Sequence, residues 1–211
     1  MIKTRCTSPL NWRLKVYMDK KEKLSLLCEK IKSCTKCELL MESTINPAFG
    51  KGNVNAKIVL IGEACGKDET EQGIPFIGRA GQMLDKVLAA IGWTLDDVYI
   101  CNILKCRPPS NRNPSQEEAD NCRAYLDLQL EIINPEYIIC LGKIPSYYML
   151  RPECTVVQFK IGAQRKQIFD RNGRKVLCTY HPSYLLRNPA AKEEVWEDLQ
   201  FFLEKKKEFD K

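Results

Sequence analysis

The sequence predicts an α/β protein, a three-layer sandwich in which helices flank a central four-stranded, mostly parallel sheet. Four short apolar runs are typical of buried strands, and they lie at residues 57–64, 98–105, 137–142 and 175–182. Segments with apolar residues at helical spacing separate these runs. Strands that alternate with helices favour a parallel sheet covered on both faces.

Local signals support several of the expected elements. Ser115 followed by Glu118 predicts a capping box, and Gly92 is suited to end the helix before it. Asn172-Gly173 predicts a hairpin turn just before the last strand. The expected helices span residues 19–33, 81–93, 115–134, about 143–150 and 189–211, and residues 38–56 are expected to form a connecting loop.

Length and composition indicate one domain. The chain has 211 residues, of which 44% are hydrophobic, so one sizeable core is possible. We expect residues 19–211 to form this domain and residues 1–18 to form an N-terminal extension. No apolar run reaches the ~20 residues of a membrane span, and the N-terminus lacks a signal-peptide core. We expect a cytoplasmic (intracellular) protein with no membrane partner, and a monomer.

The formal net charge of +6 is concentrated near the N-terminus, within residues 1–36. Basic segments of this kind contact polyanions in some proteins, but a solvated lysine-rich face is commoner. Charge alone therefore does not identify a nucleic-acid partner.

Residues 62–81, with the sequence GEACGKDETEQGIPFIGRAG, are expected to form an active-site loop directly after the first strand. Loops at the carboxyl ends of parallel strands open at the same edge of a sheet. The loops after the first, second and fourth strands therefore converge, and they carry Glu63, Asn102 and His181. His181 is the only histidine of the chain, and a single histidine is most often structural. Its place at a strand end, opposite two polar loops, favours a functional role.

Eleven cysteines in such a chain indicate reduced thiols, some of them metal ligands, rather than a disulfide framework. Cys34 and Cys37 form a C-x-x-C, and Cys106 and Cys122 flank a proline-rich loop. Four thiolates from these two places could enclose zinc or an iron–sulfur cluster, and spacing does not choose between them. The cysteines expected in the core are Cys28, Cys101, Cys140 and Cys178.

Four motifs in order resemble the family 4 uracil-DNA glycosylases, the type with a 4Fe-4S cluster. They are GE-x-x-G-x-x-E from residue 62, G-x-PF-x-G-x-AG from residue 73, CN-x-x-KCRPP-x-NR-x-P from residue 101 and HPSYLLRNP from residue 181. The similarity covers roughly residues 24–204. It implies an enzyme that flips deoxyuridine out of DNA and hydrolyses its N-glycosidic bond.

The resemblance implies a role for each pocket residue. Phe76 would stack on uracil, and Asn102 would accept from N3–H and donate to O4. His181 would donate a hydrogen bond to O2 as negative charge develops there. Glu63 and Glu69 are the carboxylates available to position water or stabilise the sugar cation, and which one dominates is left open. The main-chain amide of Ala64 would contact the base, and Glu69 has an alternative role in excluding thymine at C5.

The same resemblance assigns the DNA contacts and the cofactor. The residues that would clamp phosphates and wedge the gap are Arg107, Pro108, Asn111, Arg112, Ser183 and Arg187. Cys34, Cys37, Cys106 and Cys122 would hold the 4Fe-4S cluster, which would brace the DNA-binding loop in a structural role.

Two positions depart from the family pattern. Cys65 stands where proline is usual, and Thr70 stands where aspartate is common. An alternative function follows from these departures: a non-catalytic iron–sulfur module that binds damaged DNA. A redox enzyme with a nucleotide cofactor is disfavoured, because GEACG lacks the dinucleotide-binding fingerprint.

Overall fold

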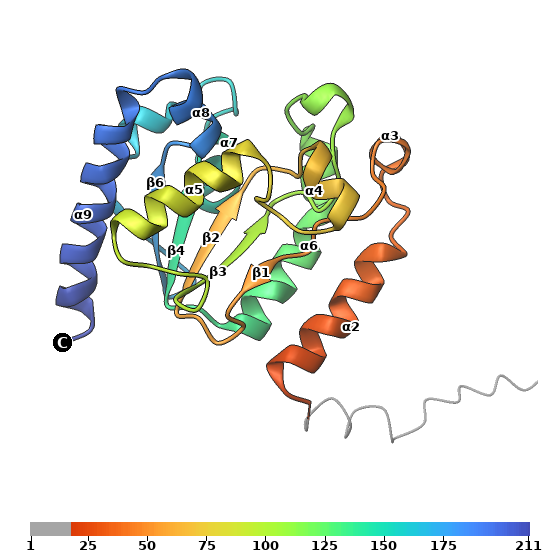
Figure 1. The fold of residues 1–211 in the computed structure, drawn as a ribbon, viewed down its shortest axis with the longest axis horizontal. Helices are drawn as coiled ribbons and strands as arrows, with labels where there is room; N and C mark the ends of the chain where they lie inside the picture. The colour runs from red at the N-terminus through yellow and green to blue at the C-terminus, as the bar shows by residue number, and fades with distance from the viewer. Residues whose placement is uncertain (1–17) are drawn as a thin grey trace, which may run out of the picture.

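The computed structural model describes residues 18–211, so all of the predicted extension except Met18 lies outside the described residues. The described chain forms one six-stranded sheet with the order β1-β3-β2-β4-β6-β5 (Figure 1). The four central strands are parallel, as predicted, and the two edge strands are antiparallel to their neighbours. The strands are β1 (Lys51–Gly52), β2 (Ile58–Gly62), β3 (Val98–Asn102), β4 (Tyr137–Leu141), β5 (Ile168–Arg171) and β6 (Arg174–Thr179).

The edge strands extend the four-stranded prediction. Strand β5 is the first arm of the hairpin predicted to turn at Asn172-Gly173, and it pairs with β6. Strand β1 lies inside the stretch expected to be a loop, and two residues are too few to leave an alternating pattern.

Helices cover both faces of the sheet and complete the three layers. They are α2 (Lys20–Lys32), α3 (Glu38–Glu42), α4 (Lys67–Gln72), α5 (Arg79–Ala90), α6 (Gln116–Ile133), α7 (Lys143–Leu150), α8 (Pro182–Arg187) and α9 (Ala191–Phe209). One core cluster joins α2, α6 and α7 to one face of the sheet, and a second joins α5, α8 and α9 to the other. Figure 1 shows α9 and α2 at opposite sides of the molecule.

The strands are apolar on both faces because both faces are covered. In β2, Val59 and Ile61 belong to one core cluster, whereas Ile58 and Leu60 belong to the other. This arrangement explains why each strand is a continuous apolar run in the sequence. A strand of a sheet that is covered on one face only would instead alternate apolar and polar residues.

The ends of two long helices are built as capping boxes. The Ser115 hydroxyl accepts from the Glu118 amide at the start of α6, as predicted, and the Asp19 carboxylate accepts from the Glu22 amide at the start of α2. Three short helices were not predicted, since α3, α4 and α8 lie in stretches expected to be loops. Each has five or six residues, which is too short for a helical period to be recognised.

The cysteines expected in the core divide into two groups. Cys101, Cys140 and Cys178 are buried in the strands, as predicted, whereas Cys28 on α2 is only half-buried. All ten cysteines within the described range are free thiols. No helix of residues 18–211 is both long and apolar enough to cross a membrane.

Candidate active site

The carboxyl ends of the parallel strands form one edge of the sheet, and a cleft of about 460 Å³ opens there. Gly62 pairs with Asn102 at the ends of β2 and β3, and Leu141 pairs with Thr179 at the ends of β4 and β6. The predicted convergence of the three loops is therefore correct. The predicted site residues that line the cleft are Glu63, Ala64, Glu69, Phe76, Pro108, Asn111, Arg112, His181, Ser183 and Arg187.

Asn102 ends β3 at this edge, is 1% exposed and is not among the residues that line the cleft. Its Oδ1 atom is buried and has no hydrogen-bond partner within residues 18–211. A Cβ atom added to Gly62 would lie 2.4 Å from this Oδ1 and 2.5 Å from Cζ of Phe76. The absence of a side chain at Gly62 thus lets the amide and the aromatic ring approach each other. An unpartnered buried acceptor is costly, so this one is suited to receive a ligand donor.

Phe76 is held in an unusual backbone conformation. Its φ of 54° lies in the left-handed region, which is strained for an aromatic residue. One hydrogen bond and one close approach of glycine accompany this turn. Lys51 Nζ on β1 donates to the Phe76 carbonyl at 2.8 Å, and a Cβ atom at Gly81 would lie only 1.9 Å from that oxygen. The ring is thereby placed 5.7 Å, centroid to centroid, from that of His181.

His181 is a neutral imidazole in a defined tautomer. Its Nδ1 accepts from the main-chain amide of Ser183 at 3.2 Å, and a main-chain amide only donates. The proton of the neutral ring is therefore on Nε2. Burial, assisted by the positive charge of Arg187, lowers the pKa of His181 to about 4. The Ser183 hydroxyl, a predicted phosphate ligand, also contacts Nδ1 at 2.8 Å.

The two predicted carboxylates have different environments. Glu69 is buried, and its oxygens accept from the amides of Gly66, Ile77 and Gly78 at 2.9–3.1 Å. It therefore ties the start of α4 to the turn that follows Phe76. The Glu63 carboxylate accepts no such bond from the described part of the chain, and burial raises its pKa to about 6. Of the two, Glu63 is the carboxylate free to act on a substrate in the cleft.

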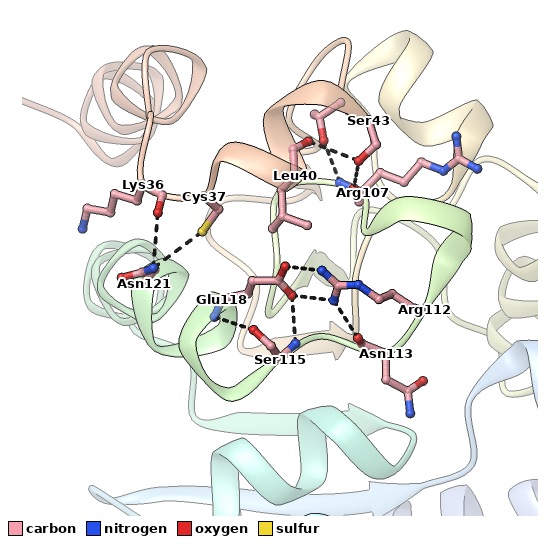
Figure 2. A network of polar contacts seen from close by, with 11 residues as sticks. Lys36, Cys37, Leu40, Ser43, Arg107, Arg112, Asn113, Ser115, Glu118 and Asn121 are labelled. Atoms are coloured by element: carbon pink, nitrogen blue, oxygen red, sulfur yellow. Dashed lines mark hydrogen bonds and ion pairs between the residues drawn. The ribbon is translucent and has the colours of Figure 1, made fainter.

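The proline-rich loop is anchored by its arginines. Figure 2 shows the Arg112 guanidinium paired with both Glu118 oxygens, at 2.5 and 2.8 Å, while Glu118 also completes the capping box of α6. Arg107 lies outside the lining of the cleft, and its Nε donates to Asn111 Oδ1 at 2.9 Å. Arg112 therefore attaches the loop to α6, and Asn111 is a loop residue that lines the cleft.

The two departures from the family pattern are buried and bonded. Cys65 Sγ donates to the Lys105 carbonyl at 3.4 Å, and burial raises the pKa of this thiol to about 12. It is therefore a packed, unreactive side chain. Thr70 Oγ1 accepts from the Ile45 amide at 2.9 Å and donates to the Asn46 carbonyl at 3.2 Å. Thr70 thereby fastens α4 to the segment that follows α3.

The four cysteines of the predicted metal site line one small cavity of about 20 Å³, together with Tyr125. Within residues 18–211, no three cysteine, histidine, aspartate or glutamate side chains are placed to hold a metal ion. The donor set itself fits, since four thiols from two separate segments meet without a competing carboxylate in the cavity lining. Cys106 directly precedes Arg107, so this cavity adjoins the anchored loop of Figure 2.

The loop after β4 was missed in the sequence. Gly142 and Lys143 line the cleft, and the predicted parallel sheet already placed this loop at the same edge. Gly142 has φ +102, and a Cβ atom there would lie 2.9 Å from Cβ of His181. The absence of a side chain at Gly142 therefore leaves space for the histidine.

Three further polar residues of the cleft lining were also missed, namely Asp68, Arg79 and Tyr184. The motifs carried no separate signal for these three residues.

Comparisons with known proteins identify the family of this chain. The family model described as the uracil DNA glycosylase superfamily matches residues 49–200. The chain is 41% identical over 170 residues to the type-4 uracil-DNA glycosylase of Thermotoga maritima, covering 80% of this chain and 86% of that protein. It is also 41% identical over 184 residues to the type-4 enzyme of Archaeoglobus fulgidus, covering 85% and 91%. A type-5 uracil-DNA glycosylase of Pyrobaculum aerophilum is 30% identical over 184 residues, covering 72% and 79%. The chain therefore belongs to the uracil DNA glycosylase superfamily and, within it, to the type-4 family.

Proposed function

We propose that this protein is a monofunctional uracil-DNA glycosylase that hydrolyses the N-glycosidic bond of deoxyuridine and leaves an abasic site for base excision repair. Its partner would be uracil-containing DNA, bound by a monomer inside the cell. The observation that carries the proposal is the buried, unpartnered Oδ1 of Asn102 beside Phe76, with His181 across the ring.

These groups can distinguish uracil from cytosine. Asn102 Oδ1 would accept from uracil N3–H, whereas cytosine presents an acceptor at N3 and would leave two acceptors facing each other. Phe76 offers an aromatic face, and stacking of one base is worth ~1–3 kcal/mol. Ala64 lines the cleft, and its main-chain amide would donate to the base.

His181 would stabilise the departing uracil as a neutral donor. Since its proton is on Nε2, the ring can donate to O2 as negative charge develops in the transition state. A pKa of about 4 keeps the imidazole neutral at physiological pH. Loss of one such preorganised donor typically costs about 10²–10³ in rate.

Glu63 would be the carboxylate that orients the attacking water or stabilises the cationic sugar. Glu69 would be a positioning residue, since both of its oxygens are bonded to main-chain amides. This assignment supports Glu63 as the dominant carboxylate of the pair.

DNA would lie across the mouth of the cleft, between the proline-rich loop and α8. Pro108 and Asn111 line one side and Arg187 the other. Arg187 has no ion-pair partner within residues 18–211 and would bind a phosphate beside the lesion. Arg112 and Ser183 would act indirectly, by holding the loop and the histidine.

Cys34, Cys37, Cys106 and Cys122 would hold a 4Fe-4S cluster next to this loop. The cluster would supply a rigid, net anionic crosslink between the segment that contains α3 and the loop at Arg107, without electron transfer in the hydrolysis. Iron and sulfide analysis and visible absorbance that bleaches on reduction test this proposal. A colourless protein with stoichiometric zinc would contradict it.

The activity is tested with an oligonucleotide that contains one deoxyuridine. We expect release of uracil and, after alkali, a strand break at that position, with no break when thymine replaces uracil. Binding of the oligonucleotide without release of uracil over a range of salt concentrations would instead support the non-catalytic module. His181→Ala should slow uracil release by about 10²–10³ and leave binding of undamaged DNA unchanged.

A further inference from the structure

Lys105 is a wholly buried lysine between the uracil-reading strand end and the cysteine-lined cavity. Its exposed fraction is 0%, and Cys106 follows it directly. Its Nζ donates to the main-chain carbonyl of Asn102 at 2.8 Å and to Oε1 of Gln129. Lys105 therefore holds the main chain of the residue proposed to read uracil.

The ammonium group has only neutral partners. No carboxylate of the described chain lies within ion-pair distance of Lys105 Nζ. Gln129 is itself wholly buried, and its amide donates to the Phe49 carbonyl at 3.0 Å. A buried charge without a countercharge is strongly unfavourable, so this site calls for a nearby anion.

The main chain of Lys105 lies beside the cysteine-lined cavity, where an anion could be held. The main-chain amide of Lys105 donates to Cys122 Sγ at 3.4 Å, and Cys106 is the next residue. The main-chain carbonyl of Lys105 accepts from the Ala48 amide at 2.7 Å and from Cys65 Sγ. One residue thus contacts a predicted cluster ligand, the loop that carries Glu63 and the strand end that carries Asn102.

We propose that Lys105 is a positioning residue for uracil recognition, in which its ammonium is the countercharge of the cysteine-held cluster and at the same time fixes Asn102. This inference rests on the proposed function and deepens it. Under this proposal, the cluster would contribute to uracil recognition through the buried charge of Lys105, and it would also brace the DNA-binding loop. The cluster, Lys105 and Asn102 are then one electrostatic unit.

The test compares Lys105→Met with Lys86→Met in the cluster-loaded, full-length protein. Lys105→Met removes the buried charge and keeps an unbranched side chain, whereas Lys86 is an exposed lysine on α5 and is the matched control. The first readout is the reduction potential of the cluster. Removal of a neighbouring positive charge disfavours the more negative reduced state, so the potential should shift to a more negative value only in Lys105→Met.

The second readout separates base recognition from backbone binding. We expect Lys105→Met to bind an oligonucleotide with non-hydrolysable 2′-fluoro-deoxyuridine about tenfold more weakly, the scale of one lost charge-assisted hydrogen bond. Affinity for abasic-site DNA should stay within about twofold, because the phosphate contacts are unaffected. Wild-type values for both readouts would overturn the proposal, and so would an equal loss of affinity for both DNAs.

Gln129→Met decides the question if Lys105→Met does not fold. This variant removes an acceptor of the ammonium but keeps the charge, so the potential should stay unchanged while 2′-fluoro-deoxyuridine binding weakens. Unchanged binding would overturn the proposal. A wild-type protein that releases no uracil would refute the proposed function, yet the shift in potential would still test the electrostatic half of this inference.

Discussion

Glu63 is expected to set the acidic limb of the pH–rate profile. A limb near pH 6 is usually attributed to histidine, whose ordinary pKa is about 6.5. Here burial lowers the pKa of His181 to about 4 and raises that of Glu63 to about 6. The rate should therefore fall as Glu63 becomes protonated, while the histidine is still neutral.

The size of the effect follows from these values. With a pKa of about 6, about nine-tenths of Glu63 is ionised at pH 7 and about one-tenth at pH 5. Below pH 6, we expect kcat/KM to fall about tenfold for each further unit of pH. Glu63→Gln should remove this limb and lower kcat by about 100-fold or more, the usual contribution of a positioned general base.

The same group makes a prediction about stability. The folded pKa of Glu63 lies above its ordinary value of 4.5, so the folded state binds more protons and the carboxylate weakens folding as the pH rises through 4.5 to 6. This difference corresponds to about 2 kcal/mol at pH 7. Glu63→Gln should therefore be more stable than the wild type by up to about that amount, although it is less active.

Single-turnover release of uracil from pH 4.5 to 8 measures the limb, and urea denaturation at pH 5 and 7 measures the stability. His181→Asn is the matched variant, because it should lower the rate at every pH and keep the limb near 6. The reasoning is refuted if the limb persists in Glu63→Gln, or if it disappears in His181→Asn.

Three further predictions use other parts of the structure. Gly62→Ala should abolish uracil release and keep undamaged-DNA binding, because the added Cβ atom would lie 2.4 Å from Oδ1 of Asn102; gel-shift and release assays check this. Asp19→Ala should lower the unfolding free energy by about 1 kcal/mol through loss of a helix cap, with unchanged kcat, and chemical denaturation measures it. Glu118→Gln should weaken DNA binding by freeing the loop at Arg112. In the wild type, this ion pair lowers the pKa of Glu118. The ion pair therefore stabilises the folded state above pH 4.5, and this stabilisation is lost as the pH falls through the pKa of Glu118 in the folded protein. Measuring the mobility of the loop during an acid titration would show this loss.

Much of the fold was predictable because its signals are local. The four parallel strands appear in the sequence as uninterrupted apolar runs, and Ser115 with Glu118 marks the start of α6. Helix α4 and helix α8 left no such signal, since each has only six residues. The convergence of Glu63, Asn102 and His181 followed from parallel topology, which depends on the order of elements and not on side-chain detail.

The sequence by itself determined the fold class, the family and most of the predicted residues that line the cleft, whereas the loop after β4, with Gly142 and Lys143, was found only in the structure. It left open which carboxylate dominates, and it could not reveal that Glu69 is bonded to three amides, that Arg112 pairs with Glu118 or that Lys105 is buried. Each of these features depends on residues that only the packing of the folded chain brings into contact. Two residues of the same type differ in chemistry when their burial and hydrogen bonding differ. Only the tertiary structure shows that Glu63 and Glu69 have different environments.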